Sequence, residues 1–283
     1  MRESVLRAGR ERALVGVATL PDGPARTGVV LLNAGLVHRV GPSRMWVALA
    51  RRLAEQGHAC LRIDFSGIGD SPDDADAARF ETRAPRETQA AMDALQEAAA
   101  VARFTLVGLC SGAEIAFKTA LEDPRVAVLV LVNAPRFLEE PSAALVARLE
   151  ERQAARYYWR VALRNPRSWW KALRGRADLA AMTRAAFLRV LRRGGRSRAA
   201  EIPDSPDARA FRTLLRRGTR IHVVLSEGDW GEDYLDAILG EHFAEGGERI
   251  QRTIVPGCDH LLTPIASQEQ LLAAVVRWAR EWR

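Results

Sequence analysis

The sequence predicts an α/β fold, in which a mostly parallel β-sheet is flanked by helices and interrupted by an inserted helical segment. Short apolar runs alternate with amphipathic segments of helical period, and near-continuous apolar runs are typical of parallel strands buried on both faces. The alternation stops after Pro135 and resumes at Ile221. We therefore expect residues 1–135 and 218–283 to form an α/β core. Residues 136–217 should form a helical cap over the carboxyl edge of the sheet, where ligands bind in such folds.

Seven strands are expected. The runs at 28–33 (GVVLLN) and 126–133 (VAVLVLVN) are almost wholly apolar and have the length of buried strands. Residues 12–20 alternate more weakly and should form a short edge strand. The remaining strands are expected at 59–65, 104–109, 221–226 and 249–255.

Helices are expected between these strands. Pro42 should open one that ends near Gly57, since Pro favours the first turn and Gly the end of a helix. Others should follow at about 86–101, from residue 111 onward, at about 233–243 and at the C-terminal end. Three of these segments carry apolar residues at helical spacing: Trp46, Leu49, Ala50 and Leu53; Ala91, Met92, Leu95 and Ala99; Leu271, Leu272, Val275, Val276, Trp278, Ala279 and Trp282.

Composition excludes several classes of protein. The 283 residues are 48% hydrophobic and 27% charged, which is ordinary for a globular chain and excludes a disordered or fibrous one. The three cysteines, Cys60, Cys110 and Cys258, fit neither a disulfide framework nor a zinc site, which favours a reducing compartment. The first twenty residues hold too short an apolar run for a signal peptide, and no run approaches the roughly 18 apolar residues of a membrane span. We expect a cytoplasmic protein.

The net charge of +7 is regional. Residues 136–220 contain 20 arginines and one lysine against eight acidic residues, a local charge of +13, so the rest of the chain carries −6. This pattern fits either solvated helix faces or a docking surface for an acidic or phosphate-bearing partner. No nucleic-acid motif accompanies the charge, so no nucleic-acid partner is expected.

The sharpest motif lies where the strand at 104–109 should meet a helix. Gly108-Leu109-Cys110-Ser111-Gly112 has the pattern glycine, any residue, nucleophile, any residue, glycine, which predicts a nucleophile elbow. Cys110 is the expected nucleophile, because centring the motif on Ser111 would put bulky Leu109 at a glycine position. A helix N-terminus and a neighbouring imidazole both stabilise a thiolate. Ser111 should supply a backbone N–H to the oxyanion.

An acid and a base should follow in chain order. Asp229 comes directly after the strand at 221–226 and is the preferred acid, with Glu227, Glu232 and Asp233 as alternatives. His260 follows the last strand and is the expected base.

The loop after residue 33 should supply a second oxyanion donor, the backbone N–H of Gly35 or Leu36. His38 and Arg39 in the same loop either contact the substrate or brace the loop. No metal and no organic cofactor is expected.

The stretches NAGLVHRVGPSR, RIDFSGIGDS and GLCSGA carry a family resemblance. The chain resembles the α/β-hydrolase superfamily over nearly its whole length. More narrowly, these stretches are similar to hydrolase-like proteins associated with exosortase and exopolysaccharide clusters. The elbow is also similar to cysteine-dependent acyl and aminoacyl shuttles of natural-product pathways. The resemblance implies a triad of Cys110, His260 and Asp229 beneath the cap, with Cys where most members have Ser.

The function expected is acyl transfer from an ester or thioester through a covalent thioester on Cys110, in a thioesterase or an acyltransferase. The arginine-rich cap favours a donor carried by an acidic carrier protein or by coenzyme A. The alternatives are an esterase of a free small ester and a non-catalytic scaffold. Five aromatic residues of the cap should line the pocket in part: Tyr157, Tyr158, Trp159, Trp169 and Trp170.

Overall fold

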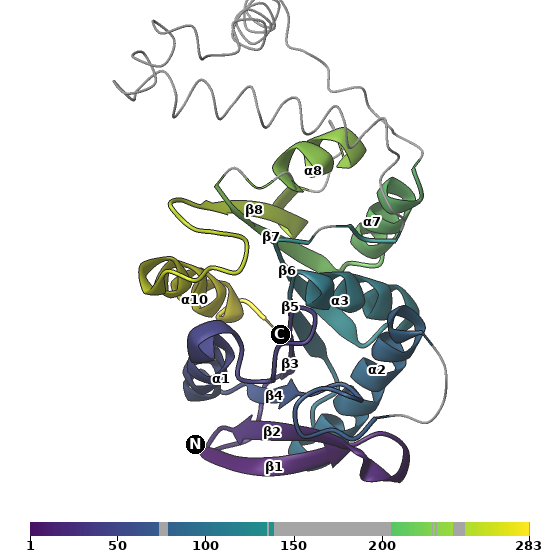
Figure 1. Ribbon diagram of the computed structural model, residues 1–283, viewed down its shortest axis with the longest axis vertical. Helices are drawn as coiled ribbons and strands as arrows, with labels where there is room; N and C mark the ends of the chain where they lie inside the picture. The colour runs from purple at the N-terminus through teal and green to yellow at the C-terminus, as the bar shows by residue number, and fades with distance from the viewer. Residues whose placement is uncertain are drawn as a thin grey trace, which may run out of the picture.

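The computed structural model describes residues 1–73, 79–134, 136–138, 205–227, 229, 231–239 and 247–282. They form one eight-stranded sheet in the order β1-β2-β4-β3-β5-β6-β7-β8 (Figure 1). The strands are β1 (Arg2–Ala8), β2 (Leu14–Leu20), β3 (Gly28–Leu32), β4 (Ala59–Ile63), β5 (Phe104–Leu109), β6 (Val126–Val132), β7 (Arg220–Ser226) and β8 (Ile250–Val255).

The sheet is mostly parallel, as expected. Strands β4, β3, β5, β6, β7 and β8 run parallel, and only the β1–β2 and β2–β4 pairs are antiparallel. The expectation that residues 12–20 form the edge strand is wrong, because β1 pairs along the whole of β2 and takes the edge itself. Strand β1 (RESVLRA) is mostly exposed and rich in charge, so it lacks the apolar pattern that marks a buried strand.

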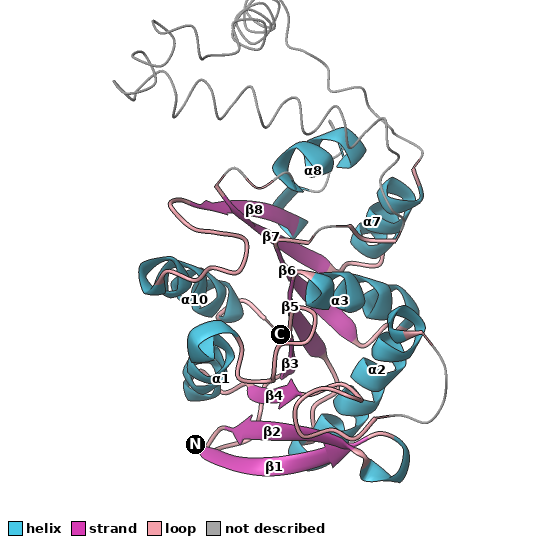
Figure 2. Ribbon diagram, viewed as in Figure 1, coloured by secondary structure: helices cyan, strands magenta, loops and turns pink. Residues whose placement is uncertain are grey.

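Helices cover both faces of the sheet (Figure 2). Helices α1 and α10 lie on one face, and α2, α3 and α7 lie on the other, with α8 beside α7 (Figure 1). The bounds are α1 (Met45–Glu55), α2 (Phe80–Ala99), α3 (Ser111–Glu122), α7 (Pro206–Arg216), α8 (Gly231–Leu239) and α10 (Ile265–Ala279), with 3-10 turns η1 (Arg10–Arg12), η2 (Pro42–Arg44) and η4 (Gly247–Arg249).

Each face of the sheet has its own apolar core. Alternate residues of β3 point to opposite sides, so that Val30 and Leu32 pack with α2 and α3 whereas Val29 and Leu31 pack with α1 and α10. Cys60 on β4 belongs to the second core and is fully buried. The predicted inward residues of α1 are all buried; in α2, Ala99 is only partly buried, as are Val276 and Trp278 in the C-terminal segment.

Most predicted boundaries lie within two residues of the observed ones. Helix α2 is the main exception, since it begins at Phe80 instead of residue 86 and contains Pro85. The additional turn is held by tertiary packing: Phe80 contacts Phe65 edge-on, with ring centroids 5.7 Å apart. Because proline is unfavourable inside a helix, the sequence pattern alone predicts that the helix begins after Pro85.

The range predicted as a cap is described only at its two ends. Within 136–217, the described residues are 136–138 and 205–217, and the five predicted pocket aromatics lie outside them. Helix α7 packs on the core, where Phe211 contacts Phe117 and Phe137 at ring-centroid distances of 4.6 and 4.7 Å. Among the described helices, none is long and apolar enough to cross a membrane.

Candidate active site

Cys110 occupies a strained turn between β5 and α3. Its φ and ψ are 54° and −119°, a region that L-residues adopt only where surrounding structure enforces it. The Cys110 N–H donates to the carbonyl of Val132 on the neighbouring strand at 2.8 Å. The turn therefore places the half-buried thiol at the carboxyl edge of the sheet and at the N-terminus of a twelve-residue helix.

The two glycines of the elbow are required by close backbone approach. A Cβ on Gly108 would lie 2.2 Å from the carbonyl oxygen of Gly112, and a Cβ on Gly112 would lie 2.6 Å from that of Leu32. Real side chains do not tolerate such contacts. The motif therefore encodes the packing of the start of α3 against the ends of β5 and β3.

Asp229 and His260 meet across the ends of β7 and β8. Asp229 Oδ2 accepts a hydrogen bond from His260 Nδ1 at 2.9 Å, and Asp229 Oδ1 accepts one from the N–H of Gly231 at 2.8 Å. The carboxylate is 7% exposed and the imidazole 39%. Because Nδ1 is bound to the carboxylate, Nε2 is the nitrogen available to a third group.

That third group is Cys110, whose thiol lies close enough to His260 to influence its pKa. The hydrogen bond to Asp229, followed by the influence of the Cys110 thiol, raises the pKa of His260 to about 10. A histidine held by a carboxylate in this way is a base that can take the proton of a neighbouring thiol.

The alternative acids are placed less favourably where they are described. Glu227 lies beside the last strand, where its Oε2 accepts from the N–H of Gly257 at 3.4 Å. Glu232 and Asp233 fall within α8, but their side chains lie outside the described residues.

The predicted oxyanion residues adjoin the elbow. The N–H of Gly35 donates to Ser111 Oγ at 2.7 Å, so this N–H is already engaged. In the described parts of the chain, the backbone N–H of Leu36 has no acceptor, and the N–H of Ser111 is one of the open donors at the start of α3. The side chain of Leu36 is 87% exposed.

His38 and Arg39 are engaged in a network with two carboxylates. The Arg39 guanidinium donates to buried Asp64, to Asp70 at 2.6 Å and to His38 Nε2 at 2.8 Å, and the Arg39 N–H donates to Asp64 at 2.6 Å. His38, Asp64 and Asp70 bring possible metal ligands within 4.8 Å of one another. Arg39 supplies the positive charge there, so the arrangement is an ion-pair network that fixes the loop.

Sequence reasoning missed Asn133, which follows β6. Its side chain donates to the carbonyl of His260 at 2.6 Å and contacts Ser226 at the end of β7. No motif marks it, because its partners lie 93 and 127 residues away along the chain.

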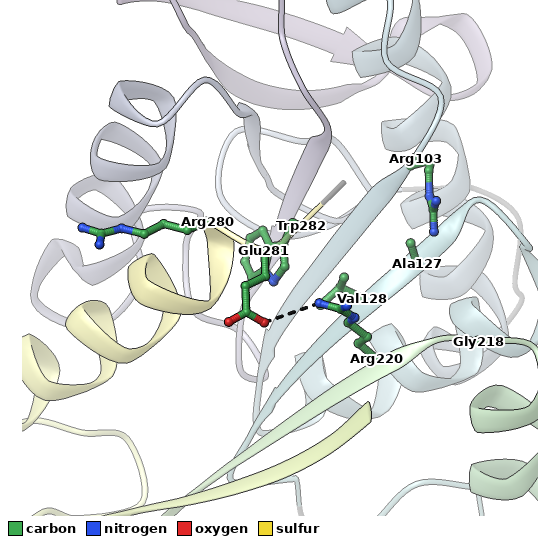
Figure 3. A pocket seen from close by; sticks show the side chains of 8 residues that line it. All are labelled: Arg103, Ala127, Val128, Gly218, Arg220, Arg280, Glu281 and Trp282. Carbon is green, nitrogen blue, oxygen red and sulfur yellow. Dashed lines mark hydrogen bonds and ion pairs between the residues drawn. The ribbon is translucent and has the colours of Figure 1, made fainter. Parts of the chain in front are cut away.

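A cavity of about 470 Å³ lies at the other end of the strands (Figure 3). Arg103 precedes β5 and Arg220 begins β7, whereas Cys110 and Asp229 follow those strands. Arg220 faces Glu281 across it at 3.5 Å. The lining residues are Arg103, Ala127, Val128, Gly218, Arg220, Arg280, Glu281 and Trp282, and none of them belongs to the Cys110 site.

Comparison with known proteins gives a consistent result. A sequence model described as "Alpha/beta hydrolase family" matches residues 29–275. A protein of Variovorax paradoxus (strain S110) named as a carbamate hydrolase, RutD, is 37% identical over 113 residues. That match spans 40% of this chain and 40% of the relative.

Solved structures are similar over nearly the whole chain. GrgF, an alpha/beta hydrolase from Penicillium sp. sh18, superposes with a TM-score of 0.58 at 18% identity and covers 100% of this chain and 99% of its own. An alpha-beta serine hydrolase homologue from Coxiella burnetii gives a TM-score of 0.56 at 15% identity, covering 98% and 96%. At such identities the likeness concerns the fold.

Proposed function

The chain belongs to the alpha/beta hydrolase family, and from this premise we propose that it transfers acyl groups from an ester or thioester through a covalent thioester on Cys110. One observation carries the proposal: a thiol on a strained elbow lies beside a histidine whose Nδ1 is held by a buried carboxylate. This is the arrangement of an activated nucleophile, its base and the group that orients the base.

In the proposed first half-reaction, the sulfur of Cys110 attacks the substrate carbonyl carbon after its proton has passed to His260. The tetrahedral intermediate then collapses, the bond to the leaving oxygen or sulfur breaks, and His260 returns the proton to the leaving group. Asp229 keeps the imidazole oriented and stabilises its charge. In the second half-reaction His260 removes a proton from the acceptor, which attacks the thioester and releases Cys110.

We infer that two backbone donors stabilise the oxyanion, the N–H of Ser111 and that of Leu36. Gly35 is the less suitable alternative, because its N–H already donates to Ser111 Oγ. Donors held in place before the reaction contribute more than donors that must reorganise.

The acyl donor is proposed to be an ester or thioester, carried by an acidic carrier protein or coenzyme A. The charge of residues 136–220 supports such a donor, since guanidinium groups bind phosphate and carboxylate in pairs of hydrogen bonds. Residues 136–217 are proposed to act as the cap. A comparison of one acyl group on coenzyme A and on N-acetylcysteamine tests this: a carrier-dependent enzyme has the higher kcat/KM with coenzyme A, and added salt removes the difference.

The central experiment is intact-protein mass spectrometry after brief incubation with acyl thioesters. Wild type and Ser111→Ala should both gain the mass of the acyl group, and Cys110→Ala should not. The neighbouring hydroxyl is the matched control, so an adduct that persists in Cys110→Ala would overturn the assignment. The name of the RutD relative adds carbamates to the substrate panel.

The same experiment separates the remaining alternatives. Loss of the thioester without an adduct indicates fast hydrolysis, and turnover of short activated esters without a carrier indicates an esterase of free esters. Neither adduct nor turnover across the panel would favour a non-catalytic scaffold.

A further inference from the structure

Asn133 is the first residue after β6 and is fully buried. Its φ of 47° lies in the left-handed region, which asparagine tolerates better than most residues. Its own N–H donates to the carbonyl of Val224 on β7 at 2.9 Å. The side chain is thereby held at the carboxyl edge of the sheet, between β7 and the loop that carries His260.

The side-chain amide of Asn133 makes three hydrogen bonds. Oδ1 accepts from the N–H of Ser226 at 2.7 Å, and Nδ2 donates to Ser226 Oγ at 2.8 Å and to the carbonyl of His260 at 2.6 Å. Ser226 Oγ in turn donates to the carbonyl of Asp259 at 2.7 Å. Two consecutive carbonyls of the histidine loop are therefore anchored to one buried side chain, one directly and one through Ser226.

We propose that Asn133 is the positioning residue that fixes the main chain of His260, so that the imidazole meets both Asp229 and Cys110. The inference rests on the proposed function, because the geometry that it maintains is that of the nucleophile and base. Asn133 has no role in the chemical steps. It acts through the backbone of residues 259 and 260.

The two N–H donors of the Asn133 side chain suit the role of positioning the His260 main chain. Both groups that it holds in the histidine loop are carbonyl oxygens, which accept only from donors. Asp229 fixes the ring of His260 from one side. A contact at the ring alone does not fix the position of the His260 main chain relative to the sheet. The Asn133–Ser226 pair supplies that second restraint at the backbone itself.

Asn133→Asp is the sharpest variant. Aspartate has the same shape and also tolerates positive φ, yet its side chain has no donor when ionised and a single O–H donor when protonated, against the two N–H donors of asparagine. Ser226→Ala removes the hydroxyl that donates to Asp259 and accepts from Asn133, but it leaves the direct bond from Asn133 to His260. Val128→Ala, at the opposite end of the same strand, is the control for a general loss of packing in β6.

Three readouts are needed: kcat and KM with an acyl thioester, the rate of Cys110 alkylation by iodoacetamide against pH, and the urea midpoint. We expect Asn133→Asp to lower kcat about 100-fold with KM within about twofold, the size of effect that a displacement of about 1 Å produces. Its alkylation profile should shift toward that of His260→Ala. Ser226→Ala should fall between this variant and wild type, and Val128→Ala should keep the wild-type profile.

The outcomes distinguish this proposal from the proposed function. If wild type forms the acyl adduct but Asn133→Asp keeps the wild-type kcat and alkylation profile, Asn133 is not a positioning residue and the proposed function stands. If wild type forms no adduct while the Asn133→Asp profile still shifts toward that of His260→Ala, the positioning role stands and acyl transfer does not. If Cys110 is alkylated with the same pH profile in wild type and in His260→Ala, both the positioning role of Asn133 and the proposed function are wrong.

Discussion

The elbow and the histidine side of the candidate site are built in different ways. The elbow is compact in sequence: Gly108, Cys110 and Gly112 lie within five residues at a strand–helix junction, and only the backbone that Gly112 approaches, at the end of β3, comes from elsewhere in the chain. The histidine side is assembled over distance, since His260 meets Asp229 across 31 residues and Asn133 across 127. We therefore expect substitutions in the elbow to affect the stability of the fold. Substitutions on the histidine side should affect the chemistry while the fold persists.

The largest effect is expected on the histidine side, from Asp229→Asn. The amide keeps the size of the carboxylate but no longer stabilises the imidazolium, and it can orient the wrong tautomer, so turnover should fall about 10⁴-fold. The variant should remain folded at neutral pH, with a urea midpoint lowered only by loss of the contribution of the Asp229–His260 pair. Wild-type turnover in this variant would show that another carboxylate is the acid. It would also contradict the proposed difference between the elbow and the histidine side of the site.

On the elbow side, Gly112→Ala should damage the fold itself. The new Cβ would lie 2.6 and 2.7 Å from the carbonyl oxygens of Leu32 and Asn33, so we expect a loss of about 3 kcal/mol in the free energy of unfolding, the upper end of the usual cost of overpacking. Gly23→Ala is the matched control, since a Cβ there meets nothing within 4 Å, and it should remain within about 0.5 kcal/mol of wild type. Equal stability of the two variants would show that the close approach is not required.

The Asp229–His260 pair should also make the stability of the protein depend on pH. The pKa of His260 is raised from 6.5 to about 10, first by its hydrogen bond to Asp229 and then by the neighbouring Cys110 thiol. Its contribution to stability should therefore be complete below about pH 6.5, decline between about 6.5 and 10, and be absent above that. Urea unfolding of wild type and Asp229→Asn across this range should give curves that converge with rising pH. Parallel curves would mean that the pair contributes no pH-dependent stability.

The smallest effect is expected from Ser111→Ala, which removes the acceptor of the Gly35 N–H and leaves Asp229 and His260 unchanged. Loss of one neutral hydrogen bond should cost about 1 kcal/mol. We expect acylation to slow about fivefold, because the Gly35–Leu36 loop loses one of its anchors. A stopped-flow measurement of thioester consumption checks this. A loss of more than about 100-fold would instead assign the hydroxyl a direct part in the reaction.

The same contrast explains which features were predictable. The parallel sheet, the helices on both faces and the elbow follow from periodicity and from one short motif, because each depends on neighbours in sequence. Strand β1 was missed since its charged residues face solvent on an edge. The early start of α2 depends on Phe80 packing against Phe65, and the engagement of the Gly35 N–H depends on Ser111. Asn133 and Ser226 could not be singled out, because their roles arise only when β6, β7 and the loop after β8 come together.

The buried thiol of Cys60 can serve as a probe of how often the sheet opens. Its sulfur lies in the interior beneath α1, and burial raises the pKa of its thiol. Cys110 and Cys258 are partly accessible, so a thiol reagent should label these two first. The slow modification of the third cysteine then reports how often β4 separates from its neighbours under native conditions.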